Sequence, residues 1–120
     1  MQDNIERRAE QRLRYQWPIW FAENTESSQE QGQMVDITSK SAAFTCYADG
    51  SYRYLGQHII TRFSVPRCGQ DDSFDMANFT RCGQIFRVEK INPFMNRIAV
   101  RFFDPLPFKP GEQAAKMAYV

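Results

Sequence analysis

Two polar segments in the first third of the chain have residue types and spacings suited to binding an anionic ligand. The first contains Arg7, Arg8 and Arg12, and the last two of these would share one face if the segment became helical. A guanidinium group can pair with a phosphate, or with the O6/N7 edge of guanine, through two parallel hydrogen bonds. The alternative is a charged chain terminus that stays in solvent.

The second segment is Val35 to Ser41, which reads as the end of a strand followed by a turn. On a strand, Val35 and Ile37 would face the core, while Asp36 and Thr38 would lie side by side on the outside. The carboxylate can accept hydrogen bonds from two adjacent donors, such as N1 and N2 of guanine, and the hydroxyl can bond the same ligand. The alternative is an ordinary Asp and Thr that close a strand into a turn.

Together the two segments resemble the PilZ domain family, whose pattern is RxxxR followed by [D/N]xSxxG. Thr38 stands where the family has Ser, which keeps the hydroxyl, and Ser41 stands where the family has Gly. Residues 83–88 and 97–102 resemble the last two barrel strands of the family, so the resemblance covers residues 6 to about 104. The residues that the resemblance assigns to ligand binding are Arg7, Arg8, Arg12, Asp36, Thr38 and Ser41.

The resemblance implies a bacterial, cytoplasmic receptor for cyclic di-GMP with no other cofactor and no metal. Its arginine arm would be mobile without ligand, order over the barrel on binding, and expose a surface to an unidentified effector protein. Ser41 lacks the backbone freedom of glycine and can crowd the guanine. One alternative is therefore a PilZ-like docking module that has lost the nucleotide, and another is a small barrel that binds single-stranded nucleic acid.

The elements that would position these residues are an arginine-rich arm over 1–14, a six-stranded antiparallel barrel over 15–108, and a tail or short helix over 109–120. Alternating apolar residues predict the strands. Their ranges are 15–21, 33–38, 42–47, 58–65, 84–91 and 97–103. Pro18 predicts an edge strand or a bulge. Trp17 is expected in the core and Trp20 on the surface, and 68–75 is expected to be a polar turn.

Composition excludes several classes of protein. The 120 residues carry 15 basic and 14 acidic side chains, a net charge of +1, which argues against a protein that simply coats DNA or an anionic membrane. We expect neither DNA nor RNA as a partner, and no insertion into a membrane. The apolar runs are too short to span a bilayer, and the chain opens without a secretory segment. His58 and the cysteines at 46, 68 and 82 lack the close pairs of a zinc site, so the cysteines are expected as reduced core residues. The common catalytic motifs are absent, which indicates a protein that is not an enzyme.

Overall fold

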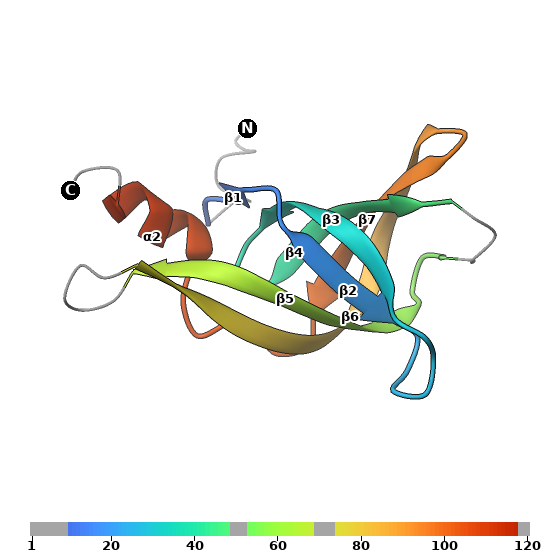
Figure 1. Ribbon diagram of the computed structural model, residues 1–120, viewed down its shortest axis with the longest axis horizontal. Coiled ribbons are helices and arrows are strands. Elements are labelled where there is room, and N and C mark those ends of the chain that lie inside the picture. Colours follow the sequence, from blue (N-terminus) through green and yellow to red (C-terminus); the bar gives the residue numbers. More distant parts are fainter. Residues whose placement is uncertain (1–9, 49–52, 69–73, 118–120) are drawn as a thin grey trace, which may run out of the picture.

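The computed structural model describes residues 10–48, 53–68 and 74–117, and it consists of a closed antiparallel β-barrel with a short helix beside it (Figure 1). The elements are β1 (Leu13–Arg14), β2 (Pro18–Ala22), β3 (Glu30–Ile37), β4 (Ser41–Tyr47), β5 (His58–Cys68), β6 (Phe74–Asn92), β7 (Met95–Phe102) and α2 (Pro110–Met117). The barrel order is β3-β2-β5-β6-β7-β4, and pairing of β4 with β3 closes it. The extra strand β1 pairs with the end of β3. The predicted all-β, six-stranded barrel is therefore confirmed.

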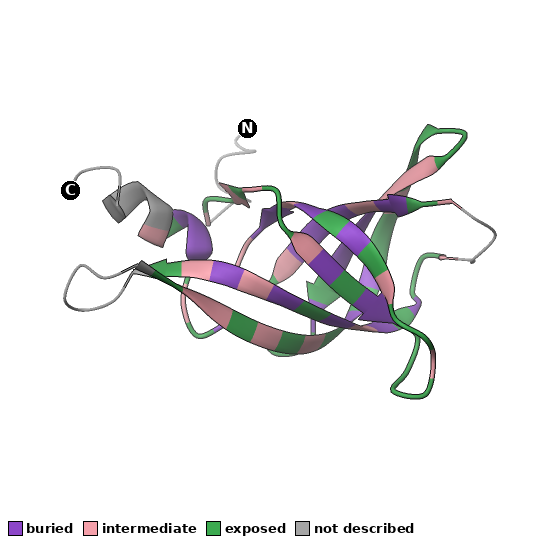
Figure 2. Ribbon diagram, in the orientation of Figure 1, coloured by how far each residue is buried: buried purple, intermediate pink, exposed green. Residues whose placement is uncertain are grey.

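The core fills the barrel because alternate side chains of each strand point inward, as the striped burial of the strands shows (Figure 2). Phe21 on β2 and Phe44 on β4 meet at its centre, with ring centroids 4.9 Å apart. Cys46 is buried there as expected, whereas Cys82 is exposed on β6, contrary to the expectation. Among the described residues, no helix has the length and apolarity needed to cross a bilayer.

The strand β6 is much longer than the predicted range of 84–91. Its first half pairs with β5 from Phe74 to Gln84, and its second half pairs with β7 from Gly83 to Asn92. The prediction of a polar turn over 68–75 is wrong at both ends, because β5 continues to Cys68 and β6 starts at Phe74. This half of β6 carries exposed polar residues, so the apolar alternation that would reveal a strand is weak there.

Gly83 lies where β6 passes from one partner to the other, and the neighbouring strand is too close for a side chain. A Cβ at this position would lie 2.5 Å from the Arg101 carbonyl oxygen and 2.8 Å from Val100 Cγ2. We expect Gly83→Ala to lower the free energy of unfolding by about 1–3 kcal/mol, because backbone must move to admit the methyl group. Urea unfolding measures this, with Cys82→Ala at the exposed neighbouring position as control. Equal midpoints for the two variants would contradict the prediction.

Two predictions about the segment before β3 are wrong. β2 is an interior strand, paired with β3 on one side and β5 on the other, so Pro18 does not mark an edge. Pro18 is tolerated because it is the first residue of the strand. Trp17 is 44% exposed rather than in the core. It lies in the break between β1 and β2, where its carbonyl accepts a hydrogen bond from Met34 N, beside a bulge that interrupts the alternation.

The helix α2 is the short C-terminal helix that the sequence allows, and it begins earlier than the helix-favouring stretch 113–117. Pro110 opens it, a position where the missing N–H is not needed. Glu112 in the first turn interacts favourably with the helix dipole and lies 3.6 Å from Lys109. The helix packs against β5 and β1, which places it beside the described end of the arm (Figure 1).

Candidate ligand-binding site

The turn from Thr38 to Ser41 is held together by the threonine hydroxyl. Thr38 Oγ1 accepts hydrogen bonds from the backbone N–H groups of Lys40 and Ser41, each at 3.1 Å, and it lies 3.1 Å from Ser41 Oγ. The backbone N–H of Thr38 donates to the carbonyl of Ser41 at 2.8 Å. Thr38 thus stabilises the turn that joins β3 to β4, and it positions the residues on either side.

A β-bulge at Val35 decides which way the end of β3 faces. The register with β4 shifts between Met34 and Asp36, so two residues of β3 oppose one of β4. Met34 and Ile37 are fully buried in the core, whereas Val35 is only half-buried, so the prediction of Val35 as a core residue is wrong. Asp36 remains on the outer surface of the barrel, but its neighbours leave only 7% of it exposed.

Strand pairing places Asp36 at one end of a row that crosses the outer surface. Asp36 pairs with Ala43 on β4, Ala43 pairs with Ala99 on β7, and Ala99 pairs with Arg87 on β6. The two alanines are 8% exposed and form the floor of a shallow depression of about 40 Å³. The residues that line this depression are Arg12, Asp36, Ser41, Ala42, Ala43, Phe86, Arg87, Glu89, Arg97 and Ala99.

The carboxylate of Asp36 sits between two guanidinium groups. Its Oδ2 lies 3.9 Å from Arg12 Nη1 and 3.6 Å from Arg97 Nη2. Both distances exceed a direct hydrogen bond, so the ion pairs are loose and easily exchanged. Phe86, which also lines the depression, is covered by Arg101, whose guanidinium lies 5.0 Å from the centre of the ring in a cation–π contact. The depression can therefore offer a carboxylate acceptor, two cationic forks and an apolar floor to one ligand.

The depression brings together three of the residues that the sequence singles out, namely Arg12, Asp36 and Ser41. Thr38 lies in the adjoining turn rather than in the lining, and Arg7 and Arg8 lie outside the described residues. Of the arm expected over 1–14, residues 10–14 are described; β1 pairs with β3 through Leu13–Ile37 and Arg14–Asp36.

The sequence did not single out Arg97, Phe86 or Glu89 as site residues. The strand pattern shows that Arg97 and Ala99 share an outward face, but local sequence does not reveal which strand lies beside them. Arg97 becomes a neighbour of Asp36 only because β7 pairs with β4 and β4 pairs with β3. The alternation of apolar and polar residues along a strand does not reveal which distant strand pairs with it.

The arm is anchored to the barrel at Tyr15. Its hydroxyl donates a hydrogen bond to the carbonyl of Ser64 on β5 at 2.8 Å, and its ring packs against the core. Burial raises the pKa of the Tyr15 phenol well above its ordinary value. Tyr15 therefore fixes the chain just after Arg12, so that Arg12 is held near the outer surface of β3.

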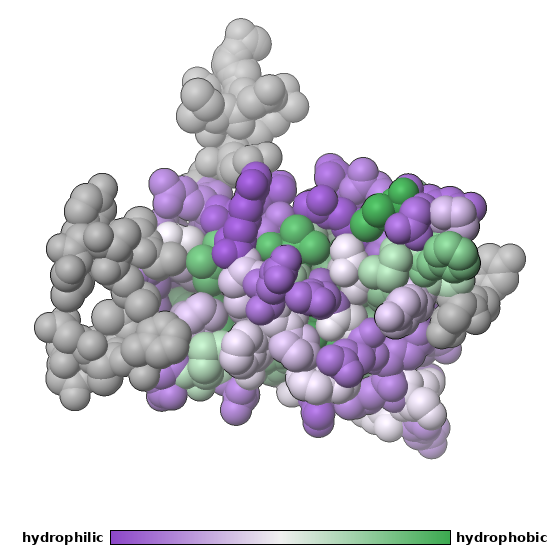
Figure 3. Space-filling view, turned by 45° about the horizontal axis from the view of Figure 1, so that its top comes forward, coloured by the Kyte–Doolittle hydropathy of each residue, from purple (hydrophilic) through white to green (hydrophobic). Residues whose placement is uncertain are grey.

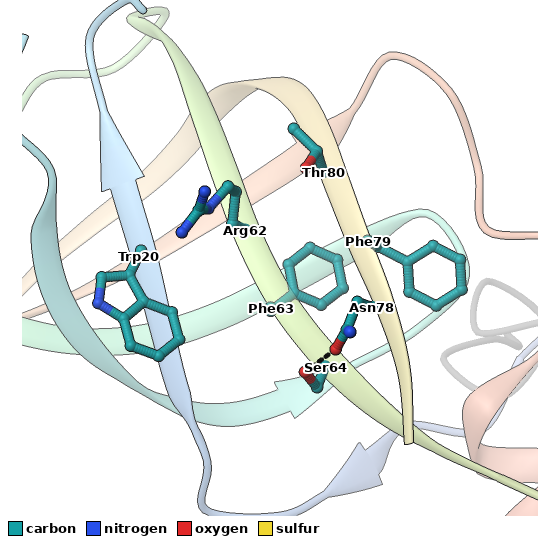
Figure 4. Close-up of a pocket in the computed structure, with 7 residues that line it drawn as sticks. All are labelled: Trp20, Arg62, Phe63, Ser64, Asn78, Phe79 and Thr80. Carbon is teal, nitrogen blue, oxygen red and sulfur yellow. Dashed lines mark hydrogen bonds between the residues drawn. The ribbon is translucent and has the colours of Figure 1, made fainter. Parts of the chain in front are cut away.

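A larger groove of about 330 Å³ lies on another part of the barrel, over β2, β5 and β6 (Figure 4). Its lining residues are Trp20, Arg62, Phe63, Ser64, Asn78, Phe79 and Thr80. Trp20 is partly exposed there, as the sequence predicts. Arg62 is the one charged residue of this lining, so the groove offers a single guanidinium group and no carboxylate acceptor, whereas the depression at Asp36 offers both kinds of group. On the face shown in Figure 3, hydrophilic side chains separate the apolar surface into small patches.

The architecture defines a PilZ-like barrel. A solved structure with this arrangement is the inhibitor of motility MotI/DgrA of Bacillus subtilis, which is 12% identical and superposes with a TM-score of 0.63. The match covers 93% of this chain and 48% of that one, so the chain spans about half the length of that structure. No protein-family model and no curated protein matches the sequence. At this identity the likeness concerns the fold.

Proposed function

We propose that the protein is a bacterial, cytoplasmic receptor that binds cyclic di-GMP in the depression at Asp36 and signals to a partner protein. The observation that carries the proposal is the convergence of Arg12, Asp36 and Ser41 on one depression. Arg12 belongs to the RxxxR segment, whereas Asp36 and Ser41 belong to the segment that resembles [D/N]xSxxG. The two segments are separated in the chain, and their convergence is what a shared ligand would require.

The proposed binding exchanges partners at Asp36. The carboxylate would accept the N1 and N2 hydrogens of one guanine in place of its two loose ion pairs. Arg12 and Arg97 would then be released to pair with a phosphate or with the O6/N7 edge of a guanine. The alanine floor supports close approach of a flat base, because neither Ala43 nor Ala99 projects beyond its Cβ. Each guanidinium group that leaves Asp36 gains a new partner on the ligand, so no charged group is left without a partner and the free-energy cost of the exchange is limited.

Isothermal titration calorimetry with cyclic di-GMP tests the proposal, and Arg12→Ala is the informative variant. We expect this substitution to weaken binding by about 1–3 kcal/mol, the scale of a hydrogen bond to a charged group. Arg62→Ala is the matched control, because Arg62 is an exposed arginine in the other groove. Its affinity should equal that of the wild type. An equal loss in both variants would indicate a general charge effect and contradict the proposed site.

A parallel titration with a single-stranded oligonucleotide separates the alternatives. The receptor predicts heat with the dinucleotide and none with the oligonucleotide at the same concentration. The reverse result would favour the barrel that binds single-stranded nucleic acid. No heat with either ligand at high protein concentration would favour a docking module that does not bind nucleotide.

A further inference from the structure

One acidic residue of the arm is bonded to the turn between β3 and β4. Glu10 Oε2 accepts a hydrogen bond from the backbone N–H of Ser39 at 2.6 Å, and Glu10 Oε1 accepts one from Ser39 Oγ at 2.7 Å. Both bonds are short and charge-assisted, and Ser39 is buried. Glu10 lies between Arg8 and Arg12 in the sequence, and Ser39 lies between Thr38 and Ser41. The contact therefore joins the two segments of the proposed binding site.

The arm is also confined on a second side, next to Glu10. A Cβ placed on Gly111 of α2 would overlap the carbonyl oxygen of Gln11. The helix therefore rests directly on the backbone of the arm, with no room for a methyl group between them. The turn itself is fixed, because the carbonyl of Ser39 accepts a hydrogen bond from Leu106 N at 2.7 Å.

We propose that Glu10 and Ser39 are positioning residues that hold Arg12 near Asp36 before the ligand arrives. The inference rests on the proposed function and deepens it. Without these bonds, the ligand would itself have to order the chain from residue 10 to residue 12, at a cost in conformational entropy. With them, Arg12 starts only 3.9 Å from Asp36 and needs a change of side-chain rotamer rather than of backbone. Binding to a preorganised arm is correspondingly tighter.

Calorimetry with cyclic di-GMP on Glu10→Ala, Ser39→Ala and the double variant tests the proposal. We expect Glu10→Ala to weaken binding about tenfold, which matches the ordering entropy of about one residue, because β1 and α2 still restrain the rest of the arm. Ser39→Ala should weaken binding less, since the backbone N–H remains. The double variant should bind no more weakly than Glu10→Ala alone, because the two side chains act as a unit. Glu26→Ala, at an exposed carboxylate, is the control and should bind like the wild type.

Unchanged affinity in Glu10→Ala would overturn the proposal. Tighter binding would overturn it too, because it would show that the carboxylate of Glu10 competes with the ligand. Urea unfolding of each variant establishes that the barrel is intact, since weaker binding by an unfolded fraction says nothing about positioning.

A second measurement needs no ligand, so the two proposals can fail separately. We expect trypsin to cleave after Arg12 about tenfold faster in Glu10→Ala than in the wild type, because local opening controls such cleavage. Faster cleavage together with no cyclic di-GMP binding by the wild type would refute the proposed function and leave the fixing of the arm intact. Normal binding with unchanged cleavage in Glu10→Ala would refute the positioning role and leave the proposed function intact.

Discussion

Replacing Asp36 with alanine is expected to weaken cyclic di-GMP binding about 100-fold, or about 2.7 kcal/mol. The carboxylate would accept two adjacent hydrogens of guanine, so its removal leaves both donors without a partner in a poorly hydrated place. The ion pairs of Asp36 with Arg12 and Arg97 do not add to this loss, because the proposed complex already exchanges them for contacts with the ligand. Calorimetry at fixed ionic strength measures the change.

The selectivity of the same variant gives a sharper measurement than its affinity. Adenine lacks the N1 and N2 hydrogens, so the wild type should prefer cyclic di-GMP to cyclic di-AMP, while Asp36→Ala should lose most of that preference. Asp36→Asn is the matched control for volume, and its amide cannot accept both hydrogens. A variant that keeps the wild-type preference for guanine would show that Asp36 does not contact the base.

Replacing Phe44 with alanine is expected to lower the free energy of unfolding by about 3–5 kcal/mol, a large part of the stability of a domain this size. Phe44 is fully buried on β4, the strand that closes the barrel, and it packs on Phe21. Gly32 lies so close that a Cβ there would be 2.9 Å from Phe44 Cδ2. Such tight surroundings cannot collapse easily, so the cavity would persist.

Urea unfolding followed by tryptophan fluorescence measures this loss, with Phe94→Ala as control. Phe94 is 72% exposed at the β6–β7 hairpin, so the same chemical change should cost less than about 0.5 kcal/mol there. A loss below about 1 kcal/mol in Phe44→Ala would mean that the barrel interior repacks freely, contrary to the close contacts described above.

The sequence predicts most of the fold because the alternation of apolar residues is strong where one strand face is buried. It identifies the strand that begins at His58, and Ile59, Phe63 and Val65 of that strand are core residues. It fails over 74–83, where the first half of β6 carries polar residues into solvent. It also misplaces Val35, because a one-residue bulge reverses the direction of the following side chains and leaves no mark in the pattern.

Some residues of the site can be predicted from short sequence motifs, whereas others depend on contacts between distant parts of the chain. Arg12, Asp36 and Ser41 can be found from their spacing, because each belongs to a short motif. Arg97 cannot, because its position beside Asp36 depends on two strand pairings that join distant parts of the chain. Glu10 is part of the arginine segment, but its partner Ser39 is 29 residues away, and only the folded chain shows the contact.

The close contact between Gly111 of α2 and the backbone of Gln11 couples the position of the helix to that of the arm. Two surfaces in contact with no free volume between them cannot shift independently, so a displacement of the arm at Gln11 must be taken up by α2. The first turn of α2 therefore moves together with the backbone of the arm. A reporter group attached at exposed Lys109, next to that turn, would record a release of the arm backbone, such as that expected in Glu10→Ala, without touching the residues proposed to bind the ligand.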